Sequence, residues 1–336
     1  MEIIRSKEIS GLMAERLVVG CVQMAPIWLN RAATLAKVAQ ELERAAAEGC
    51  QLVTFGEALV PGYPFWLEHT DGARFNNPKQ KAIYARYVDE GVDISRGDLN
   101  QIVELAKKLG VCIYLGIMER APDRGGHTLY CSLVFISSSG KIESVHRKLQ
   151  PTYEERLAWG QGDGHGLVVH QVGPFRAGGL NCFENWMPLS RAALYAQGES
   201  LHVSVWPGGL HNTYDLPSFI AKESRSYVIA VSALMRPGDF PDDMRHLEEM
   251  LATGKDFFAN GGTAICGPDG EFIIEPVVGR EALIIAELDH ALVRGERQNF
   301  DLAGHYSRPD VTKLIVNRQR QSTVEFIDQP QRQKHG

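Results

Sequence analysis

The chain has 336 residues, which suits one large α/β domain; 44% of them are apolar and 23% are charged, as in ordinary globular enzymes. The net charge of −6 argues against nucleic acid or an anionic membrane as the main partner. The six cysteines form no C-x-x-C pair, which argues against a zinc ribbon or a redox motif, and their scatter favours a reducing cytoplasm over a disulfide framework.

The two ends of the chain are predicted to lie outside the main domain. Residues 1–16 are interrupted by charges and predict an N-terminal extension rather than a secretory signal. No apolar run approaches the roughly 20 residues that are needed to span a bilayer. Residues 17–318 are predicted to form one domain, and the polar tail over 319–336 is expected to fray.

Runs rich in β-branched and aromatic residues predict strands along most of the chain. They cover residues 18–24, 51–57, 111–119, 129–137, 141–148, 167–172, 201–206, 227–234, 262–267, 271–277 and 282–289. Apolar residues spaced three and four apart predict amphipathic helices between some of these strands. The helical patterns cover residues 33–48, 98–109, 187–198 and 217–226.

The order of these elements predicts two mixed sheets. The first strands alternate with helices, as in βαβ units. Two later pairs of strands are joined by the short turns 138–140 and 268–270 and are predicted to be hairpins. About eleven strands are many for one open sheet. Two sheets packed face to face, with helices outside, would bury them better.

Cys182 is the first candidate for a reactive group. It ends the stretch FRAGGLNC and precedes Pro188, which suits the first turn of a helix. A strand, a sharp turn and a helix would present its thiol at an exposed bend, as in hydrolase nucleophile elbows. On residue type alone, a buried core cysteine is the more common alternative.

Three charged residues at or just after predicted strands are further candidates. Glu57 comes after an apolar run, where a buried unpaired carboxylate is costly and a general base is the functional interpretation. Lys148 ends a hairpin strand and can stabilise developing negative charge if it faces inward. Glu155 lies in the following loop between two charged neighbours. The ordinary alternative is a solvated strand end for Glu57 and Lys148, and a surface charge for Glu155.

Together these stretches resemble the nitrilase, or carbon–nitrogen hydrolase, superfamily. FGEALVPGYP is similar to its first motif, HRKLQPTYEERLAWG to its second and GGLNCFENWMPLSR to its third. GHYSRPDV, at residues 304–311, resembles a C-terminal motif of the nitrilase branch. The stretches follow the order of the family from about residue 17 to 316. Departures are Gly56, where proline is common, and Trp66, where a small residue is common.

The resemblance implies a four-layer αββα sandwich of two mixed sheets with outer helices, and no metal or cofactor. It implies Glu57 as general base, Lys148 as oxyanion stabiliser and Cys182 as nucleophile. It implies Glu155 as a second glutamate that positions Lys148 and the reacting water. A backbone N–H at the bend, that of Phe183, is expected to complete an oxyanion hole.

The activity that the resemblance implies is hydrolysis of a nitrile to a carboxylic acid and ammonia, through a thioimidate and a thioester on cysteine. An amidase or carbamoylase of the superfamily is an alternative with the same catalytic residues, and cyanide hydratase or dihydratase is a narrower one. CFENWMPLSR and GHYSRPDV favour the nitrilase branch. A catalytically silent binding protein of the same fold is an alternative of another class, against which the presence of Cys182 and Lys148 argues.

The substrate pocket and the assembly are less directly specified. Aromatic residues near the catalytic stretches favour an apolar or aromatic nitrile, although each can equally serve the core. These residues are Tyr63, Trp66, Trp159, Trp186 and Trp206. The resemblance implies a homodimer or a higher homo-oligomer that pairs through outer helices, with spirals in the nitrilase branch. The chain beyond Pro309 is short for a spiral-forming member.

Overall fold

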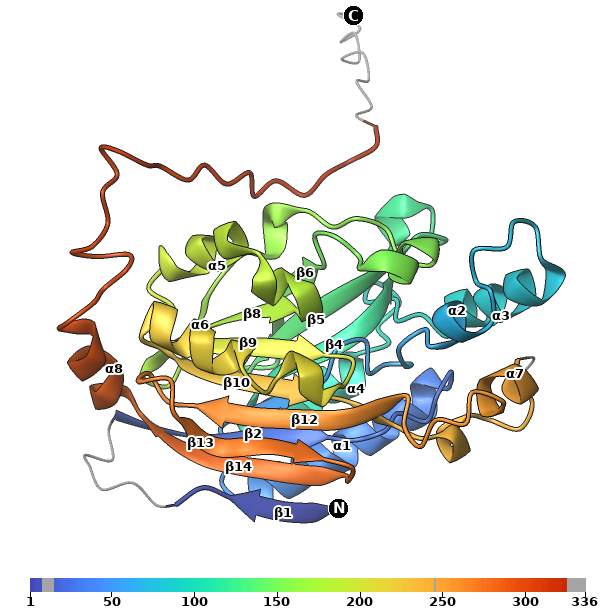
Figure 1. The fold of residues 1–336 in the computed structure, drawn as a ribbon, viewed down its shortest axis with the longest axis horizontal. Coiled ribbons are helices and arrows are strands. Elements are labelled where there is room, and N and C mark those ends of the chain that lie inside the picture. Colours follow the sequence, from blue (N-terminus) through green and yellow to red (C-terminus); the bar gives the residue numbers. More distant parts are fainter. Residues whose placement is uncertain (8–14, 245, 325–336) are drawn as a thin grey trace, which may run out of the picture.

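The computed structural model describes residues 1–7, 15–244 and 246–324, which fold into two mixed sheets (Figure 1). The first sheet has the strand order β1-β14-β2-β3-β4-β5-β6. The second has the order β11-β12-β10-β9-β8-β7, and β13 pairs with β12. The strands are β1 (Glu2–Arg5), β2 (Arg16–Gln23), β3 (Leu52–Phe55), β4 (Cys112–Arg120), β5 (Leu129–Ser137), β6 (Lys141–Arg147), β7 (His170–Val172), β8 (Phe175–Asn181), β9 (Leu201–Trp206), β10 (Tyr227–Ser232), β11 (Leu234–Met235), β12 (Ala259–Cys266), β13 (Phe272–Val278) and β14 (Ala282–Asp289).

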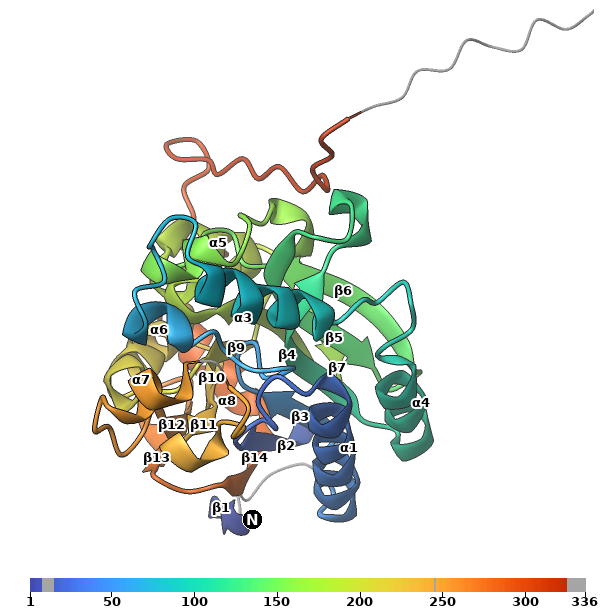
Figure 2. The ribbon, with the colours of Figure 1, turned by 90° about the vertical axis from the view of Figure 1, so that its right-hand side faces the viewer.

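Helices cover the outer face of each sheet or lie beyond the ends of the strands (Figures 1 and 2). They are α1 (Arg31–Ala47), α2 (Trp66–His69), α3 (Pro78–Asp89), α4 (Asn100–Leu109), α5 (Pro188–Tyr195), α6 (Leu216–Ser224), α7 (Leu247–Leu251) and α8 (His290–Arg297). Leu42 of α1 and Ile102 of α4 pack in one apolar cluster with the first sheet. Ile220 of α6 packs against β10 of the second sheet. The four layers confirm the predicted αββα sandwich.

The central core lies between the two sheets. Tyr114 and Phe135 of the first sheet and Val203 and Ile229 of the second belong to one buried cluster. Burial of these side chains, at about 25 cal/mol for each Å² of apolar surface, is the main force that holds the sheets together. The alternation of side chains along each strand leaves the opposite faces for the outer helices.

The predicted strands all coincide with observed strands, although their ends differ by a few residues. The run 227–234 is divided between β10 and β11, and the run 167–172 shortens to β7. The patterns did not predict α2, α3, α7 or α8. Asn77 caps α3 through its side chain, which accepts the backbone N–H of Lys79. Asn77 and Pro78 are a standard helix-start pair, so a signal for α3 was present in the sequence.

The predicted N-terminal extension contributes to the first sheet. Residues 2–5 form β1, which pairs in parallel with β14 and becomes the edge strand. Residues 8–14 lie outside the described part of the chain. The division into an extension, a domain over 17–318 and a tail stays a prediction, but β1 ties the extension to the domain. No helix of the described residues has the length and apolar character to cross a membrane.

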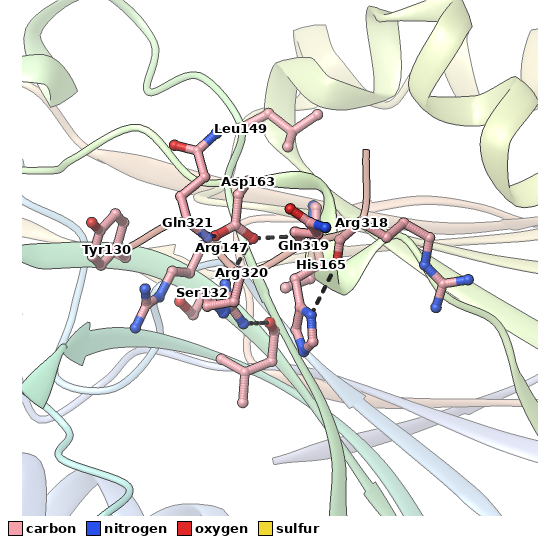
Figure 3. Close-up of polar contacts among 12 residues, drawn as sticks. Tyr130, Ser132, Arg147, Leu149, Asp163, His165, Arg318, Gln319, Arg320 and Gln321 are labelled. Carbon is pink, nitrogen blue, oxygen red and sulfur yellow. Dashed lines mark hydrogen bonds and ion pairs between the residues drawn. The ribbon is translucent and has the colours of Figure 1, made fainter. Parts of the chain in front are cut away.

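The segment after α8 runs along the surface past α5 and docks beside β6 (Figures 1 and 3). Arg320 donates to Asp163 Oδ1 at 2.9 Å and to the carbonyl of Val145 at 2.8 Å. The N–H of Gln321 donates to Asp163 Oδ2 at 3.0 Å. His165 Nδ1 lies 3.2 Å from the carbonyl oxygen of Arg318. The first residues of the predicted polar tail therefore have specific contacts, while residues 325–336 lie outside the described chain.

The replacement Arg320→Ala is expected to lower the free energy of unfolding by about 1–3 kcal/mol, because it leaves the Asp163 carboxylate without its cationic donor. Asp163 is only 5% exposed, so water cannot fully replace the guanidinium. Denaturant unfolding measures the change. Arg318→Ala is the matched control, since its guanidinium points away from Asp163 in Figure 3. Equal midpoints for the two variants would show that the docked segment adds no stability.

Candidate active site

Three strand ends bring Glu57, Lys148 and Cys182 together. Glu57 lies two residues beyond β3, Lys148 directly follows β6, and Cys182 directly follows β8 of the other sheet. The N–H of Glu57 donates to the carbonyl of Trp206 at 3.1 Å, which joins the two sheets at this edge. Cys182 Sγ and carboxylate oxygens of Glu57 and Glu155 all lie within 4.8 Å of one another. The structure thus gathers the four predicted catalytic side chains into one cluster.

Lys148 lies at the centre of the cluster. Its Nζ is 2.9 Å from Glu57 Oε1 and 2.7 Å from Glu155 Oε2. The side chains of Lys148 and Glu57 are 0% exposed, and that of Glu155 is 3% exposed. Buried charges need partners of opposite sign, and the ammonium supplies one to both carboxylates. Glu155 is therefore not the surface charge that its charged neighbours suggested.

The two carboxylates differ in the use of their oxygens. Glu155 Oε1 accepts the hydroxyl of Tyr63 at 2.7 Å, and Oε2 accepts the N–H of Thr152 at 2.6 Å as well as Lys148. Glu57 Oε1 accepts Lys148 and the thiol of Cys131, at 3.3 Å. Glu57 Oε2 is buried and has no hydrogen-bond partner among the described residues. It is therefore the oxygen that is free to take a proton.

Burial governs the protonation of the nucleophile and the base. It raises the pKa of Glu57 to about 7, with Lys148 opposing the rise and Glu155 adding to it. Burial also raises the pKa of the Cys182 thiol well above its usual value, although Lys148 and a backbone hydrogen bond from Phe183 oppose this. Cys182 is thus a neutral thiol at rest, and a base must remove its proton before it can attack.

We expect kcat/KM to fall as the pH is lowered through about 7, because protonated Glu57 cannot accept the thiol proton. Cys131→Ala removes a hydrogen bond that favours the Glu57 carboxylate, so this acid limb should move to higher pH. Cys21→Ala is the control, since Cys21 is equally buried on β2. Coincident acid limbs for the Cys131 and Cys21 variants would contradict the role of the Cys131 thiol.

The backbone at the site is strained at three places. Cys182 has φ of +47°, Ala58 of +46° and Tyr153 of +43°, in the left-handed region that non-glycine residues avoid. Ala58 follows Glu57, and Tyr153 opens the short turn that carries Glu155. Each such residue costs of order 1–2 kcal/mol, and such strain gathers where function requires it. The bend at Cys182 has the strand–turn–helix form that the sequence indicated.

Close contact between backbones explains how Glu57 reaches the cluster. The chain after β3 crosses β4 at Gly116, where a Cβ atom would lie 2.1 Å from the carbonyl oxygen of Gly56 and 2.8 Å from Glu57 Cα. A Cβ on Gly56 would itself lie 2.8 Å from the backbone nitrogen of Ala233. Any side chain at Gly116 would displace Glu57. Local sequence patterns give no signal for Gly116, because its partner Gly56 lies sixty residues earlier in the chain.

The predicted pocket aromatics lie at different distances from the cluster. The Trp159 ring lies 5.8 Å from Lys148 Nζ and packs edge-on against Tyr63. Trp206 packs in the same buried cluster as Cys182. Trp66 is buried against Trp28 and Tyr87, in the same apolar cluster as Trp159.

Trp186 ends the turn Cys182–Trp186 and is 51% exposed. Its part in the substrate pocket stays a prediction.

The cluster also has the spacing of a metal site, since Glu57, Glu155 and Cys182 each offer a ligand atom. Lys148 already lies within hydrogen-bonding distance of both carboxylates. A metal ion would have to compete with this ammonium for the same oxygens. The expectation that no metal is needed stays a prediction, with this charge balance as its physical reason.

An αββα sandwich with a glutamate, a lysine and a cysteine at its strand ends defines a class of hydrolases that act on carbon–nitrogen bonds. The chain belongs to the carbon–nitrogen hydrolase family, whose sequence model matches residues 18–298.

Two relatives and two solved structures illustrate the similarity. The chain is 34% identical to Nitrilase 2 of Arabidopsis thaliana over 309 residues, which is 91% of this chain and 90% of the relative. It is 33% identical to a bifunctional nitrilase/nitrile hydratase of Nicotiana tabacum over 318 residues, which is 91% of this chain and 87% of that protein. A carbon–nitrogen hydrolase of Helicobacter pylori superposes with a TM-score of 0.67 at 19% identity, covering 88% of this chain and 97% of its own. The NitFhit protein of C. elegans superposes with a TM-score of 0.69 at 16% identity, and the match covers 92% of this chain and 69% of that protein. At these identities the structures bear on the fold alone.

Proposed function

We propose that this protein is a nitrilase that hydrolyses a nitrile to a carboxylic acid and ammonia. The observation that carries the proposal is the buried cluster of Glu57, Lys148, Glu155 and Cys182, in which one carboxylate oxygen is free to serve the thiol. The names of the relatives support the choice of a nitrile as substrate. Of the aromatic residues, Tyr63, Trp159 and Trp206 are the proposed walls of the pocket.

The first half of the reaction uses Cys182 as nucleophile. Its sulfur attacks the nitrile carbon while Glu57 Oε2 takes the thiol proton. Glu57 then passes this proton to the nitrile nitrogen, which gives a neutral thioimidate and restores the Glu57 carboxylate. Lys148 and the N–H of Phe183 stabilise the negative charge that develops on the substrate. Cys182 is buried and uncharged at rest, so proton removal and attack are coupled.

The second half uses two water molecules. Glu57 removes a proton from the first water as it adds to the thioimidate carbon, and passes it to the nitrogen, which gives a tetrahedral intermediate with OH and NH₂ groups. The hydroxyl proton then passes through Glu57 to the same nitrogen, the C–N bond breaks, ammonia leaves and the C=O bond of the thioester forms. The thioester that remains is hydrolysed by the second water, which releases the acid and restores the thiol. Both oxygens of Glu155 already accept hydrogen bonds, so its proposed role is to position Lys148 and the reacting water rather than to take a proton.

The tetrahedral intermediate can also break down by a second route. If it expels the thiol instead of ammonia, the product is an amide. One relative is named a bifunctional nitrilase/nitrile hydratase, which makes the ratio of amide to acid a quantity worth measuring. An amidase or carbamoylase remains the alternative function, since it uses the same residues.

The test is ammonia release from aliphatic, aromatic and arylacetonitriles, each paired with its amide, with acid and amide products quantified. We expect faster release from nitriles than from the matched amides, with apolar or aromatic nitriles preferred. Faster hydrolysis of the amides would assign the chain to the amidase alternative. Preference for small polar nitriles would contradict the proposed pocket.

We also propose that a second copy of the chain covers α5, α6 and the turns before them. Large apolar side chains are exposed on this outer face. They are Phe183, Trp186, Met187, Leu189, Leu210, Tyr214 and Phe219. Grouped exposed apolar residues of this kind mark interaction surfaces, and the family resemblance implies pairing through outer helices. All six cysteines are free, which supports a reducing compartment such as the cytoplasm.

We expect Leu189→Asp to reduce the oligomer to a smaller species in light scattering after gel filtration, because a buried unpaired carboxylate at an interface costs several kcal/mol. Phe75→Asp is the control, since Phe75 is 97% exposed on a different surface. The same mass for the Leu189 and Phe75 variants would place the interface elsewhere.

A further inference from the structure

One buried carboxylate outside the catalytic cluster joins two of its members. Glu184 lies two residues after Cys182, in the turn Cys182–Trp186, and is 1% exposed. Its Oε1 accepts the N–H of Leu149 at 2.7 Å, and its Oε2 accepts the N–H of Asn181 at 2.9 Å. Leu149 follows Lys148, and Asn181 precedes Cys182.

This arrangement does more than cap the turn. The contact with Asn181 alone completes the local capping box, in which a side chain of the turn returns to the backbone that starts it. The contact with Leu149 leaves the turn and reaches the end of β6, in the other sheet. A single side chain thus sets the distance between the backbones that carry Lys148 and Cys182.

The carboxylate is held as an anion by its surroundings. His146 Nε2 lies 3.0 Å from each oxygen and donates to them. Burial would raise the pKa of Glu184, but His146 and the two backbone N–H groups outweigh it and hold the pKa below its ordinary value. His146 is itself 2% exposed, and Gly166 packs so closely on it that a Cβ would lie 2.3 Å from His146 Cα. Glu184 therefore stays charged and does not carry protons.

We propose that Glu184 is a positioning residue for the reaction. It fixes the position of the Lys148 ammonium relative to the Cys182 sulfur, across the junction of the two sheets. The inference rests on the proposed function, in which Lys148 and Cys182 act together. Small displacements matter at such a site, since an error of 1 Å in the placement of reacting groups can cost about 100-fold in rate.

The variant Glu184→Gln has nearly the same shape but replaces one accepting oxygen with an NH₂ group, which cannot accept from Leu149 or Asn181. We expect kcat for nitrile hydrolysis to fall roughly 10- to 100-fold, with KM changing less than about threefold. We also expect the alkylation of Cys182 by iodoacetamide to slow about 10-fold at pH 7 and its midpoint to move to higher pH, because Lys148 no longer supports the thiolate.

Alkylation separates this inference from the proposed function. The alkylation rate reports the reactivity of Cys182 whether or not nitriles are the substrate. If the wild-type protein does not hydrolyse nitriles, comparison of its alkylation rate with that of Glu184→Gln still tests the role of Glu184. Labelling at Cys182 is located by peptide mass spectrometry. An unchanged alkylation profile in folded Glu184→Gln would overturn the inference.

Glu119→Gln is the matched control. Glu119 is also a buried carboxylate that accepts from two partners, Arg147 and Ser132, but it contacts no residue of the turn after Cys182. Its variant should lose a similar amount of stability and keep the alkylation rate within about twofold. If both variants slow alkylation in proportion to their loss in Tm, the effect of Glu184 is structural and the inference fails.

A milder variant serves if Glu184→Gln does not fold. His146→Gln keeps a donor beside the carboxylate but loses the imidazole, so the shift in the alkylation midpoint should have the same sign and be smaller. A rate and midpoint equal to those of the wild-type protein would also count against the inference.

Discussion

Replacement of Cys182 by alanine is expected to lower kcat/KM by at least about 1,000-fold, to the limit of detection for ammonia release. The substitution removes the sulfur that lies within 4.8 Å of carboxylate oxygens of both Glu57 and Glu155, so water would have to attack the nitrile in place of the thiol. Cys182→Ser should be nearly as inactive. A hydroxyl is a poorer nucleophile than a thiol, and one buried carboxylate with a pKa near 7 is a weak base for it.

The control for this prediction is Cys266→Ala. Cys266 is a fully buried free cysteine that packs in the same apolar cluster as Cys182, so the two variants lose similar packing. Thermal unfolding should show that both remain folded, and only the Cys182 variant should lose activity. Ammonia release by Cys182→Ala at the parent rate would remove Cys182 from the mechanism.

Lys148→Ala is the second change with a large expected effect, and it acts on both activity and stability. It leaves Glu57 and Glu155 buried side by side without a cation. Breaking a buried ion pair in this way costs about 3–5 kcal/mol. We expect a drop in Tm on the order of 10 °C and a loss of kcat/KM of at least about 100-fold, because the developing anion also loses its ammonium.

A double mutant separates the two effects. Glu57→Gln added to Lys148→Ala removes one of the two carboxylates that have lost their cationic partner. The double mutant should therefore recover part of the lost stability while activity stays absent. Circular dichroism melting curves of the single and double mutants measure this coupling. A Tm for Lys148→Ala equal to that of the wild-type protein would mean that the three charges are not held together in solution.

Much of the fold was predictable because it depends on local patterns. Runs of β-branched residues placed the strands, and the two hairpins indicated mixed sheets. β1 was not predicted, because its four residues EIIR pair only with β14, nearly 280 residues later. α8 was missed because its pattern is short and highly charged.

The catalytic residues were predictable for a different reason. Glu57, Lys148, Glu155 and Cys182 lie in stretches that resemble family motifs, and the resemblance assigned them roles that no spacing could supply. Contacts made by residues outside such motifs were not predictable. Cys131 lies within β5, and its contact with Glu57 requires the chain after β3 to pass over β4, which only the folded structure shows.

The charges of the cluster also bear on how products depart. With both carboxylates ionised, one ammonium balances only one of them, so the site carries an excess negative charge. A neutral nitrile enters the site without electrostatic repulsion, whereas the negatively charged carboxylate product is repelled by the site once it forms. At one buried site this repulsion favours release over rebinding. Turnover in the presence of accumulated acid should therefore show little product inhibition above neutral pH.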